Sequence, residues 1–194
     1  MCYFKNMKKS AFGEARNFPA EENLKRLSSG SVLLARDALQ DPNFDATVVL
    51  ICIHSPEGAY GLVLNRPSHM PLSEIFDGFI GLPMKREFYI GGPVQQEELQ
   101  VLQITETPVD EAFQVAPKVY LSGKWGIAQI VETDPATTHL FLGYSGWAPG
   151  QIENEILAGA WDVYKPDIVK LFATPEKIVD SDAGNIAQFI ESLQ

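Results

Sequence analysis

The sequence predicts one α+β domain built on a mixed β-sheet. Three observations lead to this fold class. The chain has 194 residues, which suits a single domain with a sizeable core. Runs of strand-type residues separated by short turns occupy most of the chain between residues 30 and 145, and helical patterns gather after residue 150. Hairpin strands followed by helices are typical of the α+β class.

The strands are predicted from apolar runs that end at Gly, Pro or Asn. The run at 47–54 is β-branched and apolar, as in a strand covered on both faces. A five-residue turn containing Gly joins it to the next run, so the two form a hairpin. Residues 105–117 are expected to form a polar loop, and residues 123–132 have a weakly helical pattern. The predicted strands are 31–36, 47–54, 60–65, 88–91, 99–104, 119–121, 139–144 and a short one at 160–164.

The helices are predicted from apolar spacing. Residues 183–193 place Ile186, Phe189, Ile190 and Leu193 at i, i+3, i+4 and i+7, which is an amphipathic pattern. The other predicted helices are 20–29, 73–79, 150–158 and 167–172. Trp147 and Trp161 flank the helix at 150–158, and both are expected to pack against the sheet, whereas Trp125 should matter less for stability.

Charge is distributed unevenly along the chain. Six basic and three acidic residues give residues 1–30 a charge of +3, and the remaining 164 residues carry −13, for a total of −10. Residues 1–26 are predicted to be a flexible N-terminal arm, and residues 27–194 the single domain. Binding DNA requires Lys and Arg to neutralise phosphates, so direct DNA binding is not expected beyond a weak, salt-sensitive contact of the arm. A protein held to anionic membranes by charge is disfavoured for the same reason.

The cysteine content and the length of the apolar runs indicate the cellular compartment in which the protein is expected. Cys2 and Cys52 are too few for a disulfide framework, and Cys52 lies inside an apolar run as a small core residue would. The longest apolar run, Val48 to Ile53, has six residues, whereas a membrane helix needs about 20. No signal peptide is visible. The expectation is a cytoplasmic protein with no membrane segment.

No recognisable catalytic motif is present. The phosphate-binding glycine fingerprints and the spaced His and Cys ligands of zinc sites are missing from the sequence, so neither a cofactor nor a metal is expected. Residues 143–147 (GYSGW) come close to a hydrolase nucleophile elbow, but Trp147 stands where that motif needs Gly, and no His follows Ser145. The structural interpretation is that Gly143 and Gly146 let the backbone turn sharply while Trp147 covers a helix end.

Two interpretations of the strand ends stay open. Three turns, at 65–67 (NRP), 91–93 (GGP) and 145–147 (SGW), would converge on one groove if strand ends meet there. The alternative is structural, with glycines that serve tight turns, a capping or core role for the histidine, and an ion pair for the arginine. The candidate groove or contact residues are His54, Asn65, Arg66, Gly91, Gly92, Ser145, Trp147 and Gln151.

A resemblance covers about residues 27–175. Its motifs are GSVLLA at 30–35, DPNF at 41–44, TVVLICIH at 47–54 with EGA at 57–59, GLVLNRP at 61–67, YIGGPV at 89–94 and LFLGYSGWAPGQIENEI at 140–156. In this order they resemble the AlgH family of bacterial proteins, also called the YqgE family. The resemblance implies a single α+β domain with a mixed, partly folded sheet and flanking helices, no established reaction and no known cofactor.

The family carries a transcriptional-regulator label, linked to alginate, that one member gave it. The label fits this chain poorly, since nothing here reads as a helix-turn-helix and the body is acidic. The chain also departs from the family in its long arm and in lacking a Trp after the turn at 174–175. The function expected first is a binding or regulatory module acting through protein contacts, with apolar groups around Trp147 as the patch. The alternative is a small-ligand-binding protein or enzyme that uses the groove, with His54 as acid or base.

Overall fold

The computed structural model describes residues 18–36, 38–39, 41–70, 87–108, 111–123, 137–179 and 183–194. The predicted helix at 73–79, most of the 123–132 segment with Trp125, and arm residues 1–17 lie outside the described residues. The domain boundary predicted at residue 26 therefore stays a prediction. Within the described part, residues 20–26 form a helix that contacts a strand and a helix of the domain.

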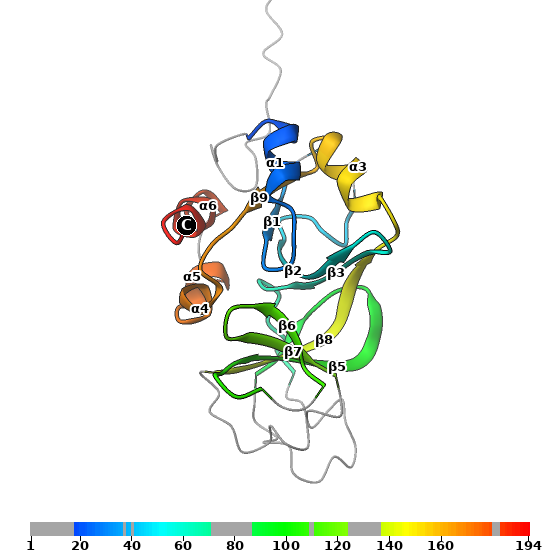
Figure 1. Cartoon of the computed structure of the whole chain (residues 1–194). Helices are drawn as coiled ribbons and strands as arrows, with labels where there is room; N and C mark the ends of the chain where they lie inside the picture. Colours follow the sequence, from blue (N-terminus) through cyan, green and yellow to red (C-terminus); the bar gives the residue numbers. More distant parts are fainter. Residues whose placement is uncertain are drawn as a thin grey trace, which may run out of the picture.

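A run of strands from β1 to β8 follows the first helix, and most of the other helices come near the end of the chain, as Figure 1 shows. The first half holds α1 (Ala20–Arg26), β1 (Val32–Ala35), β2 (Val48–Ser55), β3 (Gly58–Val63), β4 (Tyr89–Ile90) and β5 (Val94–Ile104). The second half holds β6 (Phe113–Ala116), β7 (Val119–Ser122), β8 (Thr138–Trp147), α3 (Gln151–Leu157), β9 (Trp161–Tyr164), α4 (Ile168–Phe172), α5 (Glu176–Val179) and α6 (Ala183–Glu191).

The described strands form one sheet in the order β6-β7-β5-β8-β3-β2-β1-β9, and β4 pairs with β8 beside this path. The β4–β8 pair is parallel and the other pairs are antiparallel, so the sheet is mixed. The early part of β8 pairs with β5, and its last three residues pair with β3. The sheet folds along this long strand into two halves, visible as an upper and a lower group of strands in Figure 1. The predicted fold class, α+β with a mixed and partly folded sheet, is confirmed.

Besides β5, which begins at Val94 and not at residue 99, three elements differ from the sequence prediction. β6 forms where a polar loop was expected. The strand was not predicted because only Val115 of its four residues is buried, which leaves too weak an alternation of apolar and polar residues. The short helix α5 was not predicted. The third difference is that β8 continues through Trp147, so 145–147 is the end of a strand and not a turn. Gly143 has a φ of 67° yet the strand continues beyond it, because β3 pairs with the residues that follow.

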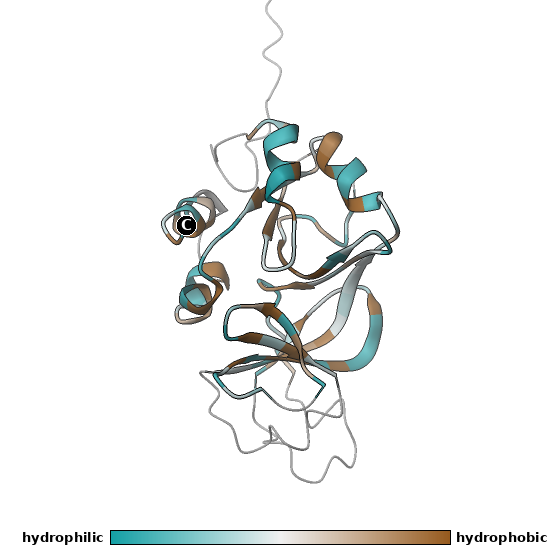
Figure 2. Cartoon of the chain, viewed as in Figure 1, coloured by the Kyte–Doolittle hydropathy of each residue, from teal (hydrophilic) through white to brown (hydrophobic). Residues whose placement is uncertain are grey.

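The core lies between the two halves of the sheet and under the helices. Strand residues from β1, β2 and β3 fill it, and hydrophobic colouring follows these strands in Figure 2, while the outer bend of β5 is hydrophilic. Trp161 is 0% exposed and Trp147 5%, which confirms that both indoles pack inward. The amphipathic pattern of α6 is also confirmed, since Ile186 and Ile190 are buried. No helix in the described ranges is long and apolar enough to cross a lipid bilayer.

Candidate functional site

One carboxylate of the short helix α3 is hydrogen-bonded to two tryptophans of the sheet. Glu155 Oε2 accepts hydrogen bonds from Trp147 Nε1 at 3.0 Å and from Trp161 Nε1 at 2.8 Å. Its Oε1 accepts from Gln151 Nε2 at 2.9 Å, which matches the shared helix face expected for residues four apart. We call Trp147, Gln151, Glu155 and Trp161 the α3 clamp. It satisfies two indole N–H donors that would otherwise be buried without a partner.

Aromatic packing completes the clamp. The Phe44 ring stacks on Trp147 at a centroid distance of 5.8 Å and meets Trp161 edge-on at 5.7 Å. The two indoles meet each other at 6.3 Å with their planes 74° apart. With its ring covered in this way, Trp147 is a core residue. The contact patch expected around Trp147 therefore cannot include the indole itself.

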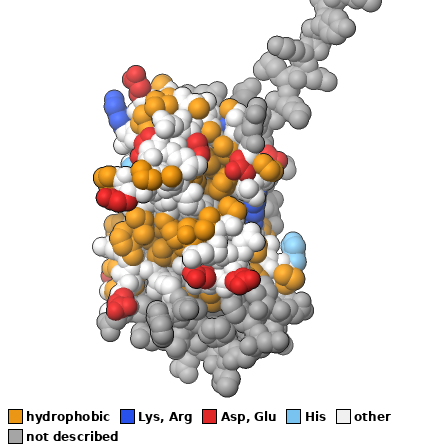
Figure 3. Space-filling model, turned by 90° about the vertical axis from the view of Figure 1, so that its right-hand side faces the viewer, with side chains coloured by type: hydrophobic (Ala, Val, Ile, Leu, Met, Phe, Trp, Pro, Cys, Tyr) orange, Lys and Arg blue, Asp and Glu red, His pale blue; other side chains and the backbone are white. Residues whose placement is uncertain are grey.

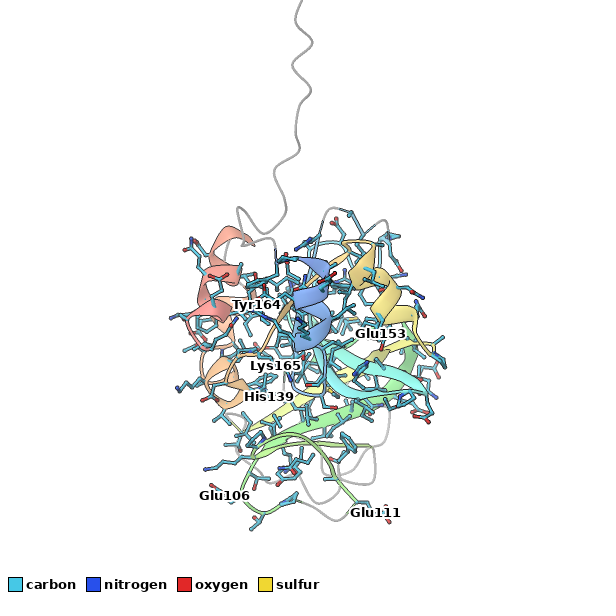
Figure 4. All side chains as sticks on the ribbon, turned by 45° about the horizontal axis from the view of Figure 1, so that its top comes forward. Glu106, Glu111, His139, Glu153, Tyr164 and Lys165 are labelled. Atoms are coloured by element: carbon cyan, nitrogen blue, oxygen red, sulfur yellow. The ribbon has the colours of Figure 1, made fainter. Side chains whose placement is uncertain are left out.

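His54 of β2 pairs with Glu153 of α3 at the edge of the α3 clamp. His54 Nε2 donates to Glu153 Oε1 at 2.7 Å, and the two side chains are 22% and 35% exposed. Burial of Glu153 on its own raises the pKa of this carboxyl. The hydrogen bond from His54, a backbone hydrogen bond and the imidazole charge together bring the pKa below its ordinary value. The pair, with Glu153 labelled in Figure 4, attaches the outer side of α3 to β2.

A second group of predicted residues lies where the chain leaves β3. Asn65 Oδ1 accepts from Val48 N at 2.9 Å, and its Nδ2 donates to Ala46 O at 2.8 Å. The Arg66 carbonyl accepts from Ile90 N at 2.8 Å, which joins the 65–67 turn to β4. Among the described residues, the Arg66 guanidinium reaches only the Asp45 carbonyl, at 3.4 Å. These contacts use Asn65 for structure and leave Arg66 as a partly exposed cation.

Gly91 and Gly92 lie against β8 too closely to leave a groove. A Cβ on Gly91 would lie 2.4 Å from the Gly143 carbonyl oxygen, and one on Gly92 would lie 2.3 Å from the Tyr144 carbonyl oxygen. Ser145 is fully buried, and its hydroxyl donates to Gly91 O at 3.2 Å. The glycines serve a close approach of two backbones, which is the structural interpretation of these positions. The buried hydroxyl of Ser145 gives no support to a nucleophile.

The structure therefore divides the eight predicted site residues into two groups. His54, Trp147 and Gln151 gather at α3, and Asn65, Arg66, Gly91, Gly92 and Ser145 gather where β4 meets β8. None of them lines either of two surface hollows formed by described residues, of about 550 and 340 Å³. Among the residues that the structure describes, no three His, Cys, Asp or Glu side chains are grouped as a metal site would require.

Two tyrosines that the sequence did not single out form a distinctive surface. The rings of Tyr60 on β3 and Tyr144 on β8 stack at 4.3 Å with 17° between their planes. Tyr60 lies opposite Gly146, and Val94 of β5 lies opposite Tyr144. We call Ile53, Tyr60, Val94 and Tyr144, all partly exposed, the tyrosine face. The sequence could have indicated this surface only through the register of β3 against β8, because Tyr60 and Tyr144 share a face only if these strands pair. That pairing is long-range and has no local signal.

An acidic arc borders the tyrosine face. Between Val94 and Leu99, residues 95–98 (QQEE) oppose only Gly143 of β8, so they bulge outward and are exposed. Burial is the main cause that raises the pKa of Tyr60, and the charge of Glu98 adds to it. Figure 3 turns this side of the molecule to the viewer and shows a broad hydrophobic band with acidic side chains around it.

The sequence and fold match known proteins. The AlgH-like family model matches residues 32–181. A UPF0301 protein of Chlorobaculum tepidum is 36% identical over 139 residues, covering 70% of this chain and 73% of the relative. A UPF0301 protein of Hahella chejuensis is 36% identical over 157 residues, covering 77% and 84%.

Solved structures agree. The solution structure of the AlgH protein from Pseudomonas aeruginosa superposes with a TM-score of 0.65 at 30% identity, covering 76% of this chain and 82% of that one. A crystal structure of a Corynebacterium diphtheriae protein shares the fold with a TM-score of 0.62 at 24% identity, covering 81% and 84%. With the family model spanning most of the domain, the chain belongs to the AlgH-like family of UPF0301 proteins.

Proposed function

We propose that the protein is a cytoplasmic binding module that acts through protein contacts, and that its tyrosine face binds a basic, apolar segment of a partner protein. The observation that carries the proposal is the stacked Tyr60–Tyr144 pair, partly exposed beside an acidic arc. Tyrosine is enriched in the centres of protein interfaces, because its ring supplies a large apolar area, and here the rings rather than the buried Tyr60 hydroxyl form the surface. The α3 clamp, in contrast, is occupied with its own hydrogen bonds.

Charge favours a basic partner. Glu97 and Glu98 on the arc and Glu57 in the β2–β3 turn are exposed. The hydrogen bond from the Ser55 hydroxyl lowers the pKa of Glu57, so that carboxylate stays ionised at neutral pH. Residues 31–194 carry −13 in total, which attracts Lys- and Arg-rich segments over distance. If the protein regulates transcription, as the family label suggests, a protein contact on this face is the physically easier route.

The test uses a photo-crosslinker beside the face. Gln96, exposed on the arc, is replaced by benzoylphenylalanine in bacterial cells, and the crosslinked protein and segment are identified by mass spectrometry. The proposal expects one recurring segment with several Lys or Arg residues. Glu97→Lys with Glu98→Lys should abolish this product. Leu157→Ser is the matched control, since Leu157 is 55% exposed on α3 and lies outside the face.

Two outcomes would contradict the proposal. One is a crosslinked segment that is acidic or whose capture survives the double charge reversal. The other is loss of the product in the Leu157→Ser control as well as in the charge reversal, which would place the contact on α3 rather than on the tyrosine face.

A further inference from the structure

A groove of about 550 Å³ lies between three segments that are distant in sequence. The β6–β7 hairpin turn forms one wall, the turn before β1 a second, and the β9–α4 junction a third. We call it the β6–α4 groove. Its volume falls in the range of small-molecule pockets, about 300–1,000 Å³. It shares no residue with the tyrosine face.

The walls of the β6–α4 groove are mostly hydrocarbon. Val115 and Ile168 are each 4% exposed and form firm parts of the wall. Pro166 is buried beside them, and Ala116 and Val169 are partly exposed. Such walls favour an apolar body in the groove, because burying its surface releases water.

Most of the charged groups at the groove already have partners. Asp167 Oδ1 accepts from Lys170 N at 3.2 Å, which caps α4, and its Oδ2 lies 3.5 Å from Lys170 Nζ. Lys118 Nζ lies 2.5 Å from Glu106 Oε1. These groups are therefore compensated within the chain.

Lys165 differs from Asp167 and Lys118 in that its partner among the described residues is a hydroxyl and not a charged group. Its ammonium donates to the Ser28 hydroxyl, which in turn donates to the Ser29 carbonyl at 3.1 Å. No carboxylate of the described residues lies within ion-pair distance of Lys165. Lys165 is exposed, but partial desolvation still lowers its pKa, and no anion of the described residues offsets this loss of hydration. Figure 4 labels Lys165 between α1 and α4.

We infer that the β6–α4 groove binds a small amphipathic carboxylic acid, with the carboxylate on the Lys165 ammonium and the apolar body along Val115, Pro166 and Ile168. Ser28 acts as a positioning residue, because its hydroxyl holds the ammonium at the groove. An anion there supplies the opposite charge that none of the described residues provides. Apolar walls with one charged group are the usual composition of small-molecule sites.

The test titrates octanoate into the ¹⁵N-labelled full chain and follows backbone amide shifts. The inference expects saturable shifts confined to residues 29–30, 115–118 and 165–169. 1-Octanol and octylamine, which have the same chain length, should bind at least about tenfold more weakly, because they lose the charge-assisted hydrogen bond. Equal affinity for octanoate and octanol, or shifts centred elsewhere, would overturn it.

A variant pair isolates the lysine. Lys165→Met should weaken octanoate at least about tenfold and leave octanol unchanged. Lys25→Met, at an exposed lysine of α1 that does not line the groove, should leave octanoate binding as in the parent. Equal losses in the two variants would show a general charge effect and overturn the assignment. The Glu97→Lys, Glu98→Lys variant should bind octanoate normally, so this inference and the proposed function can fail separately.

Discussion

Removing the Glu155 carboxylate is predicted to destabilise the domain more than its partial exposure suggests. Glu155→Ala deletes the acceptor shared by the Trp147 and Trp161 indoles and also the acceptor of Gln151. Both indoles are buried, so their N–H groups would be left without partners. A buried donor that loses its partner costs about 1–3 kcal/mol. The two indoles together therefore give an expected loss of about 2–6 kcal/mol in the free energy of unfolding.

Glu155→Gln measures how much the charge of the carboxylate contributes, apart from its role as an acceptor. The amide oxygen can still accept from both indoles, whereas the charge assistance and the hydrogen bond from the exposed Gln151 side chain are lost, because an amide nitrogen replaces Oε1. We expect a loss of about 1 kcal/mol, since hydrogen bonds to charged acceptors exceed neutral ones by roughly that amount. Glu153→Ala is the matched control on the same helix. Its partner His54 is partly exposed, and pairs of that kind contribute under about 1 kcal/mol.

The assay is urea unfolding monitored by far-UV circular dichroism. All variants are fitted with one common m-value, so that differences in midpoint report differences in the free energy of unfolding. The account predicts the order Glu155→Ala, then Glu155→Gln, then Glu153→Ala, from most to least destabilised. If Glu155→Ala unfolds within about 0.5 kcal/mol of the parent, as an ordinary surface substitution does, the carboxylate is not holding the two indoles.

Three further predictions concern other parts of the chain. Gly92→Ala should fail to fold or lose several kcal/mol, because its Cβ would meet the Tyr144 carbonyl. Gly150→Ala, which also has a positive φ but open space around it, should lose only about 1 kcal/mol in the same urea assay. The pKa of Glu153 is lowered on folding, so its contribution is present above the ordinary pKa of 4.5 and is lost as pH falls through the lower folded value. The stability gap between the parent and Glu153→Gln should therefore shrink between about pH 6 and pH 3, and a gap that widens on acidification contradicts the His54 pairing. Gel shifts with duplex DNA should show at most weak binding that disappears at physiological salt, and tight sequence-specific binding there would refute the charge argument.

The framework of the fold could be predicted from sequence because its signals are local. The apolar run at 47–54, the turn after it and the helical spacing of 183–193 depend only on neighbouring residues. The inward packing of Trp161 followed from the small residues before it. β6 was missed because only Val115 of its four residues is fully buried, and a short edge strand of that kind has almost no pattern.

The candidate site could be predicted only in part, because it depends on long-range register. The glycines at 91–92 were correctly expected to serve backbone geometry, but their contact is β8, which no local rule identifies. The end of β8 was placed too early because Gly143 and Gly146 suggest a turn, whereas pairing with β3 keeps the backbone extended. Tyr60 and Tyr144 lie 84 positions apart in sequence, and their stacking follows only from that same pairing. The hydrogen bonds that converge on Glu155 likewise needed the folded chain.

The most direct test of the protein-contact proposal measures affinity for the segment captured at Gln96. That segment is synthesised as a peptide and titrated calorimetrically into the full chain at about 50 and about 300 mM salt, where screening differs strongly. The account predicts saturable binding that weakens as salt rises and that falls at least about tenfold in the Glu97→Lys, Glu98→Lys variant, with Leu157→Ser unchanged. Binding that is indifferent to both the salt and the charge reversal would contradict the assignment of the tyrosine face and its acidic arc as the contact surface.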